Sequence, residues 1–369
     1  MSKNTQPFVL YDNQIFDLQR FGGISRYFCE ILRRLSIEKD IAVRYSINYY
    51  LTTYKLGKHR IPLPRFIFKH YRNLFHNKNK ELSEKLLQEK NNYLFHPTYY
   101  DPYFLKYIGK NPYIITVHDM IHEKFPSSFY NVSEIIAQKK EVITHASRII
   151  AISENTKKDI IDLLHIAPEK IDVIYHSTSM KPSTGKQCLE LPNTFLLFVG
   201  DRTPYKNFNR LVKAFAELSA KDKNLFLVCT GLPFKQSEKA FLDKLNISNK
   251  VIQIKATDKI LSELYSRARL FVFPSLYEGF GIPILEAYAC HCPVALSNSS
   301  CFPEIAGNAG AYFDPYSETS ILESIKDIIY NDKKRTELIM KGTERLKLYS
   351  WEKATILTQK TYLKALNTK

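Results

Sequence analysis

Short apolar, β-branched segments alternate with segments of helical periodicity along most of this 369-residue chain. This alternation is the pattern of βαβ units, whose strands form parallel sheets. The chain is longer than one ordinary domain, and 44% of its residues are hydrophobic, enough to bury more than one core. The sequence therefore predicts an α/β protein with two doubly wound, Rossmann-like domains facing a cleft. Ligands of such sheets bind beyond the carboxyl ends of the strands.

The periodicity assigns elements to each half of the chain. The predicted strands are 8–11, 93–96, 113–118, 148–152 and 171–175, followed by 195–199, 225–230, 251–254, 270–273 and 294–296. The predicted helices are 24–35, 154–164, 208–220, 235–245, 259–268 and 282–290, with helical sequence from 319 onward. Ser153 is a suitable N-cap for the helix 154–164. Residues 178–193 contain Pro and Gly without periodicity and are the predicted linker.

The formal net charge of +16 favours an anionic partner such as nucleic acid, anionic lipid or a phosphorylated substrate. The segment from Lys55 to Lys80 holds eight Lys and Arg, no Asp or Glu, and several interleaved aromatic residues. Two interpretations stay open for it. It is either a solvated, partly helical excursion of the first domain or a surface that binds anionic membranes.

The remaining composition points to the reducing cytoplasm. The first residues are polar and no long apolar segment follows, so we expect neither a secretory signal nor a spanning helix. The spacing of the six cysteines does not suggest a disulfide framework. Cys290-His291-Cys292 lies in an apolar helical stretch without a second ligand pair nearby, and we interpret it as buried packing rather than a metal site.

The segment from Phe271 to Glu286 carries the strongest functional signal, because it is a strand, a glycine loop and a helix in succession. Gly279 and Gly281 allow the backbone to approach a ligand, and the helix start offers free N–H groups to a phosphate. Glu278 and Glu286 can accept hydrogen bonds from sugar and ribose hydroxyls. The alternative is that Glu278 caps the helix and Glu286 lies on the surface, but the apolar flanks favour a buried polar role.

Three further segments follow predicted strands. After Gly200, Arg202 and Lys206 are placed to neutralise a diphosphate, although cations in such loops are often only solvated. Gly22 and Gly23 form a glycine turn that does not match the dinucleotide fingerprint and is otherwise explained as a tight turn. His118 ends a strand and can hydrogen bond a sugar hydroxyl or a phosphate, although a lone histidine is more often structural.

Taken together, these segments resemble the retaining glycosyltransferases of the large GT-B family that includes bacterial mannosyl- and glucosyltransferases. The resemblance extends over nearly the whole chain. Glu278 and Glu286, with seven residues between them, resemble the carboxylate pair of the family. The segments 16–27, 96–103, 116–126 and 151–159 resemble the N-terminal half of members that build surface polysaccharides.

The resemblance implies a role for each residue. Glu278 and the backbone of Gly279, Phe280 and Gly281 would hold the donor sugar, and Glu286 would hold the ribose. Arg202 and Lys206, which follow Gly200, would bind the diphosphate. Gly22 and Gly23 would approach the donor from the other domain, and His118 would contact the donor sugar near the reacting centre. Many members place the arginine directly after the strand-end glycine, where this chain has Asp201, so Lys206 keeps the family spacing and Arg202 does not.

The resulting prediction is a retaining glycosyltransferase with an N-terminal domain over 1–180 and a nucleotide-sugar-binding domain over 193–350. The helix 351–369 is expected to cross back to the first domain, as in similar folds. The co-substrate would be a nucleoside-diphosphate sugar, with GDP-mannose as a candidate, and no metal or other cofactor is expected. The acceptor would be a saccharide or lipid-linked saccharide of surface polysaccharide biosynthesis, met at the inner face of the cytoplasmic membrane.

Two alternatives belong to other classes. A sugar-nucleotide epimerase of similar architecture would turn over the donor without an acceptor. A non-enzymatic binding protein would use the basic charge alone. Nucleic acid is not an expected partner, because the aromatic residues do not form an RNA-binding strand signature.

Overall fold

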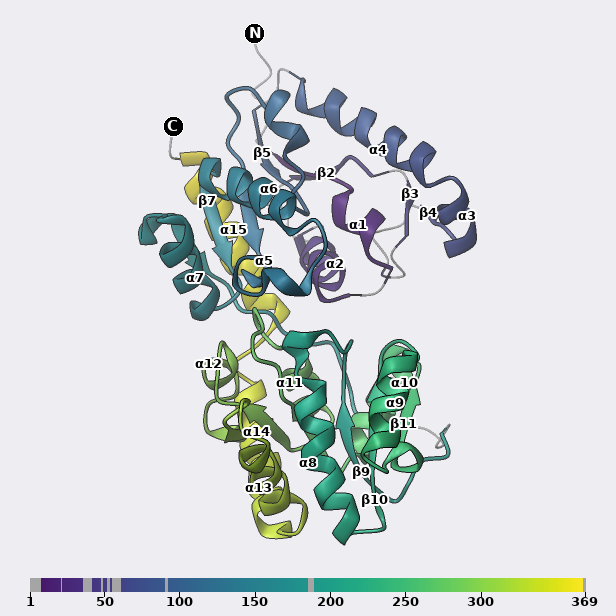
Figure 1. Ribbon diagram of the computed structural model, residues 1–369. Coiled ribbons are helices and arrows are strands. Elements are labelled where there is room, and N and C mark those ends of the chain that lie inside the picture. Colours follow the sequence, from purple (N-terminus) through teal and green to yellow (C-terminus); the bar gives the residue numbers. More distant parts are fainter. Residues whose placement is uncertain are drawn as a thin grey trace. The chain divides into compact units, whose positions relative to one another are not determined.

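The computed structural model in Figure 1 describes residues 8–20, 22–35, 42–47, 49–51, 54, 61–89, 92–184 and 189–367. Its chain divides into two compact units. Unit 1 consists of Met1–His176 and Ser350–Lys369, and unit 2 consists of Ser177–Tyr349. Both units are α/β structures with parallel strands, which confirms the predicted fold class.

Unit 2 contains a six-stranded parallel sheet in the order β11-β10-β9-β12-β13-β14. Its strands are β9 (Thr194–Phe198), β10 (Leu225–Thr230), β11 (Val251–Ile254), β12 (Leu270–Phe273), β13 (Val294–Ser297) and β14 (Gly310–Phe313). The chain runs outward from β9 to β11, then returns to β12 and runs outward the other way. The strand order therefore reverses between β9 and β12, which is where ligands of doubly wound sheets bind.

The helices of unit 2 connect these strands. They are α8 (Phe208–Lys221), α9 (Gln236–Lys244), α10 (Asp258–Arg267), α11 (Ile282–Ala289), α12 (Phe302–Ala306), α13 (Glu318–Ile329) and α14 (Asp332–Leu346). Short 3-10 turns lie between them at η4 (Pro204–Lys206), η5 (Ser248–Lys250) and η6 (Gly307–Ala309).

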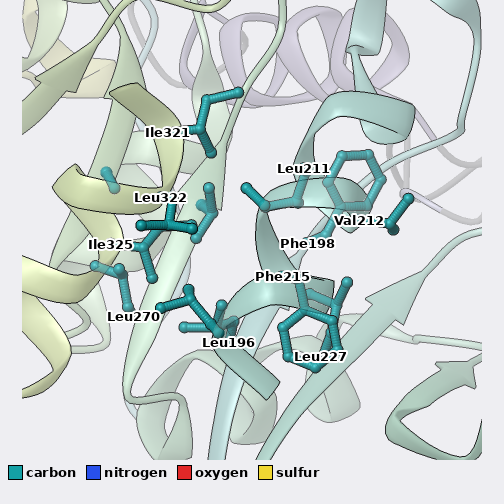
Figure 2. Close-up of a cluster of buried hydrophobic side chains, with 14 of the residues drawn as sticks. Leu196, Phe198, Leu211, Val212, Phe215, Leu227, Leu270, Ile321, Leu322 and Ile325 are labelled. Carbon is teal, nitrogen blue, oxygen red and sulfur yellow. The ribbon is translucent and has the colours of Figure 1, made fainter. Parts of the chain in front are cut away.

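The core of unit 2 forms where α8 and α13 cover the sheet. Figure 2 shows side chains of β9, β10 and β12 packed against both helices, among them Leu196, Phe198, Leu227, Leu270, Leu211, Val212, Phe215, Ile321, Leu322 and Ile325. Burying each such aliphatic or aromatic side chain contributes roughly 1.5–3 kcal/mol. The strands are apolar on both faces, as expected for parallel strands covered by helices. This packing holds the carboxyl ends of the strands, and the loops that follow them, in fixed positions.

Unit 1 contains two three-stranded parallel sheets, in the orders β2-β1-β5 and β6-β7-β8. Its strands are β1 (Phe8–Tyr11), β2 (Ala42–Tyr45), β5 (Tyr93–His96), β6 (Ile114–Val117), β7 (Arg148–Ala151) and β8 (Ile171–Val173). A single parallel bridge between Phe95 and Tyr113 joins β5 to the start of the second sheet. A separate parallel pair is formed by β3 (Tyr49–Tyr50) and β4 (Ile61–Pro62).

Eight α-helices of the described residues belong to unit 1. They are α1 (Gln14–Leu18), α2 (Gly23–Leu35), α3 (Arg65–His70), α4 (Arg72–Leu87), α5 (Ile121–Lys124), α6 (Val132–His145), α7 (Glu154–Leu164) and α15 (Trp351–Asn367). Three 3-10 turns accompany them at η1 (Pro102–Lys106), η2 (Pro126–Ser128) and η3 (Pro168–Lys170). Ser153 caps α7 as predicted, because its hydroxyl accepts a hydrogen bond from the Thr156 amide at 3.0 Å.

The last helix, α15, packs in unit 1, and Figure 1 shows it in yellow beside β7. Its buried side chains Trp351, Ala354 and Tyr362 join the core that contains Phe28. The Tyr362 hydroxyl is 2.9 Å from His96 Nδ1, and Lys364 Nζ is 2.6 Å from the Asp172 carboxylate. The chain therefore leaves unit 1 after His176 and returns to it at Ser350.

The segment predicted as a linker, 178–193, is hydrogen bonded to α10 where it is described. Ser262 Oγ donates to the Lys181 carbonyl at 2.6 Å, and Arg267 donates to the Leu189 carbonyl at 3.0 Å. Along the chain, the boundary between unit 1 and unit 2 lies between His176 and Ser177, just before this segment. The segment is therefore fastened to unit 2 at these points.

Several residues singled out in the sequence lie outside the described residues, namely Lys55, Lys58, Arg60 and Cys188. The described part of the basic segment contains β4, α3 and the first part of α4. The five described cysteines are buried and have free thiols. Among the described helices, none combines the length and the apolar composition needed to cross a membrane.

Candidate functional site

The main candidate site lies in unit 2, at the carboxyl ends of β9, β12 and β13. These three strands are neighbours in the sheet, so the loops that follow them lie at one edge. The predicted residues Lys206, Glu278 and Glu286 all come from the loops and helix at this edge. The strand order reverses between β9 and β12, which places the first two residues on either side of the switch point.

Lys206 and Glu278 form an ion pair across this point. Lys206 Nζ and Glu278 Oε1 are 2.6 Å apart, and each side chain is only 15% exposed. Burial acts against the charge of Lys206, but the nearby Glu278 carboxylate and the Tyr205 hydroxyl outweigh it and raise the pKa of Lys206 above its ordinary value. Lys206 is therefore a fixed cation that a polyanionic ligand can meet.

Backbone contacts hold the two loops together around this ion pair. The Leu276 amide donates to the Tyr205 carbonyl at 2.7 Å. Asn207, which stands in the left-handed region at φ 59°, donates its side-chain amide to the carbonyls of Pro274 at 3.0 Å and Pro315 at 2.7 Å. Because Asn207 is buried and joins three loops, the positions of Lys206 and Glu278 are set by the scaffold.

The start of α11 follows the Glu278 loop. Gly281 precedes the helix with φ 85°, and a Cβ atom there would lie 3.1 Å from Ile284 and 3.3 Å from Phe302. The positive φ favours glycine at this position, and a larger residue would also press against these two side chains. Pro283 lies in the first turn, where its missing N–H removes no helical hydrogen bond. The Ile284 amide already donates to the Gly281 carbonyl at 2.9 Å, so it is the positive end of the helix dipole that favours a phosphate here.

Phe280 and Gly279 complete this loop. The Phe280 ring is buried and meets the Tyr349 ring edge-on, with centroids 5.9 Å apart. The phenylalanine side chain therefore anchors the loop to the interior of unit 2. At this position the loop can therefore offer a ligand only its backbone N–H and C=O groups.

Glu286 is buried one turn into α11, at 5% exposure, which rules out the alternative of a surface residue. The Tyr265 hydroxyl on α10 donates to Glu286 Oε2 at 3.4 Å. Burial, and then the Glu286 carboxylate, raise the pKa of Tyr265 well above its ordinary value, so the phenol stays protonated and remains a donor. The two carboxylates of the predicted pair thus have different partners, a lysine for Glu278 and a tyrosine for Glu286.

Arg202 points to a different part of unit 2. Its guanidinium forms an ion pair with Glu238 of α9 at 2.7 Å and donates to the carbonyls of Leu232 at 2.6 Å and Pro233 at 3.2 Å. These groups belong to α9 and to the loop between β10 and α9. The structure therefore brings Lys206 to Glu278 but joins Arg202 to the β10–α9 loop.

Gly200 follows β9 and lies beside that same loop. Its φ of 126° is in the region that favours glycine, and its amide donates to Thr230 Oγ1 at 3.2 Å. A Cβ atom on Gly231 would lie 2.4 Å from the Gly200 carbonyl oxygen. The two glycines therefore let the ends of β9 and β10 approach closely.

A second group of predicted residues lies in unit 1, at the end of β6. His118 is buried, and its ring packs edge-on against Tyr27 and Phe28 of α2, with centroids 5.4 and 5.9 Å away. Burial, together with His96 and Lys139, lowers the pKa of His118 to about 3. Its Nε2 atom has no hydrogen-bond partner among the described residues. His118 is therefore a neutral histidine with one unused ring nitrogen.

Gly22 and Gly23 stand at the start of α2, the helix against which His118 packs. The Gly22 carbonyl accepts from the Ser25 hydroxyl at 3.2 Å and from the Arg26 amide at 3.1 Å. A tight turn would call for glycine if the backbone had a positive φ. Neither Gly22 nor Gly23 is among the positive-φ residues, so the structure does not support that explanation. A Cβ atom on Gly22 would lie 2.3 Å from Gln19 Oε1.

Sequence reasoning missed several residues that shape the unit 2 site. Asn207, Tyr265 and Ser300 all contact the predicted residues or their loops. The polar run from Ser297 to Ser300, directly after the apolar strand 294–296, was an available signal for the last of these. Within the described residues, no group of three or more His, Cys, Asp or Glu side chains is arranged to hold a metal ion.

Family models match both halves of the chain. Residues 185–345 match the model described as glycosyl transferases group 1, and residues 21–179 match that of glycosyltransferase family 4. The chain is 27% identical over 301 residues to the O-antigen chain mannosyltransferase B of Escherichia coli, covering 75% of each chain. It is 32% identical over 215 residues to the O-antigen chain mannosyltransferase RfbU of Salmonella typhimurium, covering 58% of this chain and 60% of that protein.

A solved structure supports the fold. The sucrose-phosphate synthase of Thermosynechococcus elongatus superposes with a TM-score of 0.74 at 18% identity, covering 99% of this chain and 100% of the other. At this level of identity the similarity concerns architecture alone.

Proposed function

The chain belongs to the glycosyltransferases of group 1 with the GT-B fold, and on that premise we propose that it transfers a sugar from a nucleoside-diphosphate sugar to a growing surface polysaccharide. The observation that carries this proposal is the Lys206–Glu278 pair at the switch point of unit 2, beside the start of α11. A cation, a carboxylate and the positive end of a helix are groups that suit a diphosphate sugar. We favour GDP-mannose as the donor, because both relatives above are named as mannosyltransferases.

In this proposal, Lys206 exchanges its contact with Glu278 for the diphosphate, and Glu278 turns to accept hydrogen bonds from the donor sugar. Glu286 accepts from the ribose hydroxyls. As the bond between the anomeric carbon and the phosphate oxygen breaks, the electron pair leaves with the diphosphate. Lys206 and the positive end of the α11 dipole interact with the negative charge that develops there, so they stabilise the transition state more than the bound donor.

We further propose that the anomeric configuration is retained and that no metal is required. The acceptor hydroxyl would attack from the face that the diphosphate leaves, and its proton would pass to the leaving phosphate. The positive charge opposite the diphosphate would come from Lys206 and the helix start. His118 of unit 1 is neutral and has an unused ring nitrogen, so any role it has would be as a hydrogen-bonding group rather than as a proton donor.

The acceptor would be a saccharide carried on a membrane lipid, which requires the enzyme to reach a membrane. Exposed aromatic and aliphatic side chains support this, with Phe66, Tyr71 and Leu74 exposed by 75%, 50% and 50% on α3 and α4. Lys69, Arg72 and Lys78 are exposed in the same two helices and the link between them. We define these six residues as the α3–α4 surface. Cations beside exposed apolar groups suit an anionic lipid surface.

The test begins with thermal unfolding of the protein in the presence of GDP-mannose, UDP-glucose, GDP and UDP. A ligand at a hundred times its dissociation constant should stabilise the protein by roughly 2.7 kcal/mol. The stabilising donor is then incubated with lipid-linked saccharide from bacterial membranes, and the anomeric proton of the product is followed by NMR, with and without EDTA.

Transfer with retention, unaffected by EDTA, is the expected result. Inversion would overturn the retaining proposal, and turnover of the donor to an isomer without acceptor would favour an epimerase. Lys206→Ala should abolish most of the transfer. Lys213→Ala is the matched control, because Lys213 pairs with Glu318 at 2.7 Å on the surface of the same unit.

A further inference from the structure

One hydroxyl group holds both polar atoms of the Glu278 backbone. Ser300 Oγ accepts a hydrogen bond from the Glu278 amide at 3.2 Å and donates one to the Glu278 carbonyl at 2.7 Å. A serine hydroxyl can do both at once, because it carries one proton and two lone pairs. The backbone of the residue that carries the candidate carboxylate is therefore clamped by a side chain from the loop after β13.

Ser300 makes these contacts from a backbone conformation that a serine rarely adopts. Its φ is 54°, in the left-handed region. Glycine or asparagine occupies that region at lower cost than serine does. Glycine would therefore fit this backbone conformation better than serine does. Serine differs from glycine in supplying the hydroxyl group. An observed strain of this kind points to a functional constraint at the residue.

The loop that carries Ser300 is itself anchored to the sheet. The Asn298 amide donates to the Phe313 carbonyl at the end of β14 at 2.8 Å. The adjacent Ser299 hydroxyl donates to the Leu276 carbonyl at 3.2 Å. The Glu278 loop is thus held by two consecutive serines on the β13 side, and by Tyr205 and Lys206 on the β9 side.

We propose that Ser300 is a positioning residue for sugar recognition, acting through Glu278. This inference rests on the proposed function, in which Glu278 accepts hydrogen bonds from the donor sugar. Lys206 holds the carboxylate end of Glu278, and Ser300 holds its backbone. When the diphosphate takes Lys206, Ser300 is the contact that keeps the carboxylate directed at the sugar. Ser300 therefore contributes to binding of the sugar part of the donor and not to binding of the nucleotide part.

Two variants separate the hydroxyl from the backbone conformation. Ser300→Gly removes the hydroxyl and relieves the positive φ, whereas Ser300→Ala removes the hydroxyl and keeps the unfavourable φ. Ser317→Ala is the matched control, because the Ser317 hydroxyl caps α13 in the same unit by accepting from the Ser320 amide at 3.1 Å. Calorimetry gives the affinity of each protein for GDP-mannose and for GDP, or for UDP-glucose and UDP if those stabilise the parent.

Both Ser300 variants should lose affinity for the sugar nucleotide relative to the free nucleotide by about tenfold, the scale of one hydrogen bond to a charged group. Their affinity for the free nucleotide should stay at the parent value, and Ser317→Ala should match the parent in both. An unchanged ratio in Ser300→Gly overturns the proposal. An equal loss for sugar nucleotide and free nucleotide also overturns it, because the effect is then on the whole loop. A parent that binds none of the four ligands refutes the proposed function instead.

Discussion

Lys206 Nζ and Glu278 Oε1 lie 2.6 Å apart, although the two residues are 72 positions apart in the sequence. The sheet order makes them neighbours, because β9 and β12 pair directly at the switch point. A donor that binds here has to divide this pair, with phosphate taking the cation and a sugar hydroxyl taking the carboxylate. The site therefore contains a cation for the diphosphate and a carboxylate for the sugar, and the two groups pair with each other when no donor is bound.

Lys206→Ala should lower kcat by about 10²–10³-fold, the effect of losing one group that stabilises transition-state charge. Steady-state kinetics with saturating donor measures this. Lys213→Ala should keep the parent kcat, because Lys213 pairs with Glu318 at 2.7 Å and both of these side chains are exposed. A Lys206→Ala enzyme with the parent kcat would remove Lys206 from the diphosphate site.

Arg202→Ala should act mainly on stability. The change leaves Glu238 without its cation and the carbonyls of Leu232 and Pro233 without their donor. Loss of one partner from such a largely buried pair should cost about 3 kcal/mol in the free energy of unfolding, measured by urea denaturation. Its kcat should fall far less than that of Lys206→Ala. If kcat falls equally while stability is unchanged, Arg202 binds the diphosphate after all.

Glu286→Ala should weaken the binding of free GDP or UDP and leave the fold intact. The reason is the buried position of Glu286 one turn into α11, where its carboxylate faces the Tyr265 hydroxyl. A hydrogen bond to a charged group is worth roughly 1.5–3 kcal/mol, so affinity should drop about tenfold or more. Glu344→Ala, which removes an exposed partner of Lys347, is the control. Parent-like nucleotide affinity in Glu286→Ala would refute the ribose assignment.

Unit 1 should lose stability in mild acid because its buried histidines are neutral. Burial lowers the pKa of His96 and of His118 to about 3. Above the unfolded pKa of about 6.5 both states are neutral and no stability is lost. As the pH falls from about 6.5 toward 3, the unfolded chain takes up protons that the folded chain refuses, and at pH 5 each such histidine costs about 2 kcal/mol.

Calorimetric unfolding at pH 7 and pH 5 measures this loss. In His118→Asn the difference between the two pH values should shrink, whereas in His145→Asn it should not, because His145 is exposed. An unchanged difference in His118→Asn would show that His118 is protonated in the folded protein. The neutral His118 also predicts that the pH profile of activity has no step from this residue between pH 5 and 8.

Binding to anionic vesicles should depend on the α3–α4 surface. Replacing Lys69, Arg72 and Lys78 by Ser should weaken binding to phosphatidylglycerol-containing vesicles by about a hundredfold, since each cation near such a surface contributes about 1 kcal/mol. Sedimentation with vesicles measures this, and high salt should weaken the parent in the same way. The control is the exposed triple Lys239, Lys244 and Lys259 to Ser in unit 2, with the same change in charge. Equal binding by both triple variants would exclude the surface.

The sequence predicted those parts of the fold that depend on local pattern. The strands 8–11, 93–96 and 270–273 were predicted to the residue, because each is a short, mainly apolar run with a polar residue at one end and a proline at the other. β2 and β14 were missed, since Ala42–Tyr45 is partly exposed and Gly310–Phe313 contains small residues with no clear alternation. β3 and β4 have only two residues each, too few for a periodic signal.

The candidate site was predictable in its location and only partly in its contacts. Strand-end motifs could be recognised one at a time, which is how Glu278 and Lys206 were found. Their partners depend on which strands are neighbours, and that is a property of the sheet and not of the local sequence. Arg202 illustrates the limit, because its ion pair is with Glu238, 36 positions away in a helix that the pattern gave no reason to join to it. The contact between Ser300 and Glu278 was not predicted for the same reason, because the two residues are 22 positions apart and follow different strands.

The return of α15 to unit 1 makes unit 2 an insertion within unit 1, from Ser177 to Tyr349. On the ribosome, unit 2 can fold as soon as its last strand and helices emerge, whereas unit 1 has to wait for residues made after all of unit 2. A chain stopped after Tyr349 would leave the surfaces around Phe28 and His96, which Trp351 and Tyr362 cover, open to water. Truncation near the C-terminus should thus damage the N-terminal unit first, and a fragment of residues 177–349 is the natural choice for expressing one unit alone.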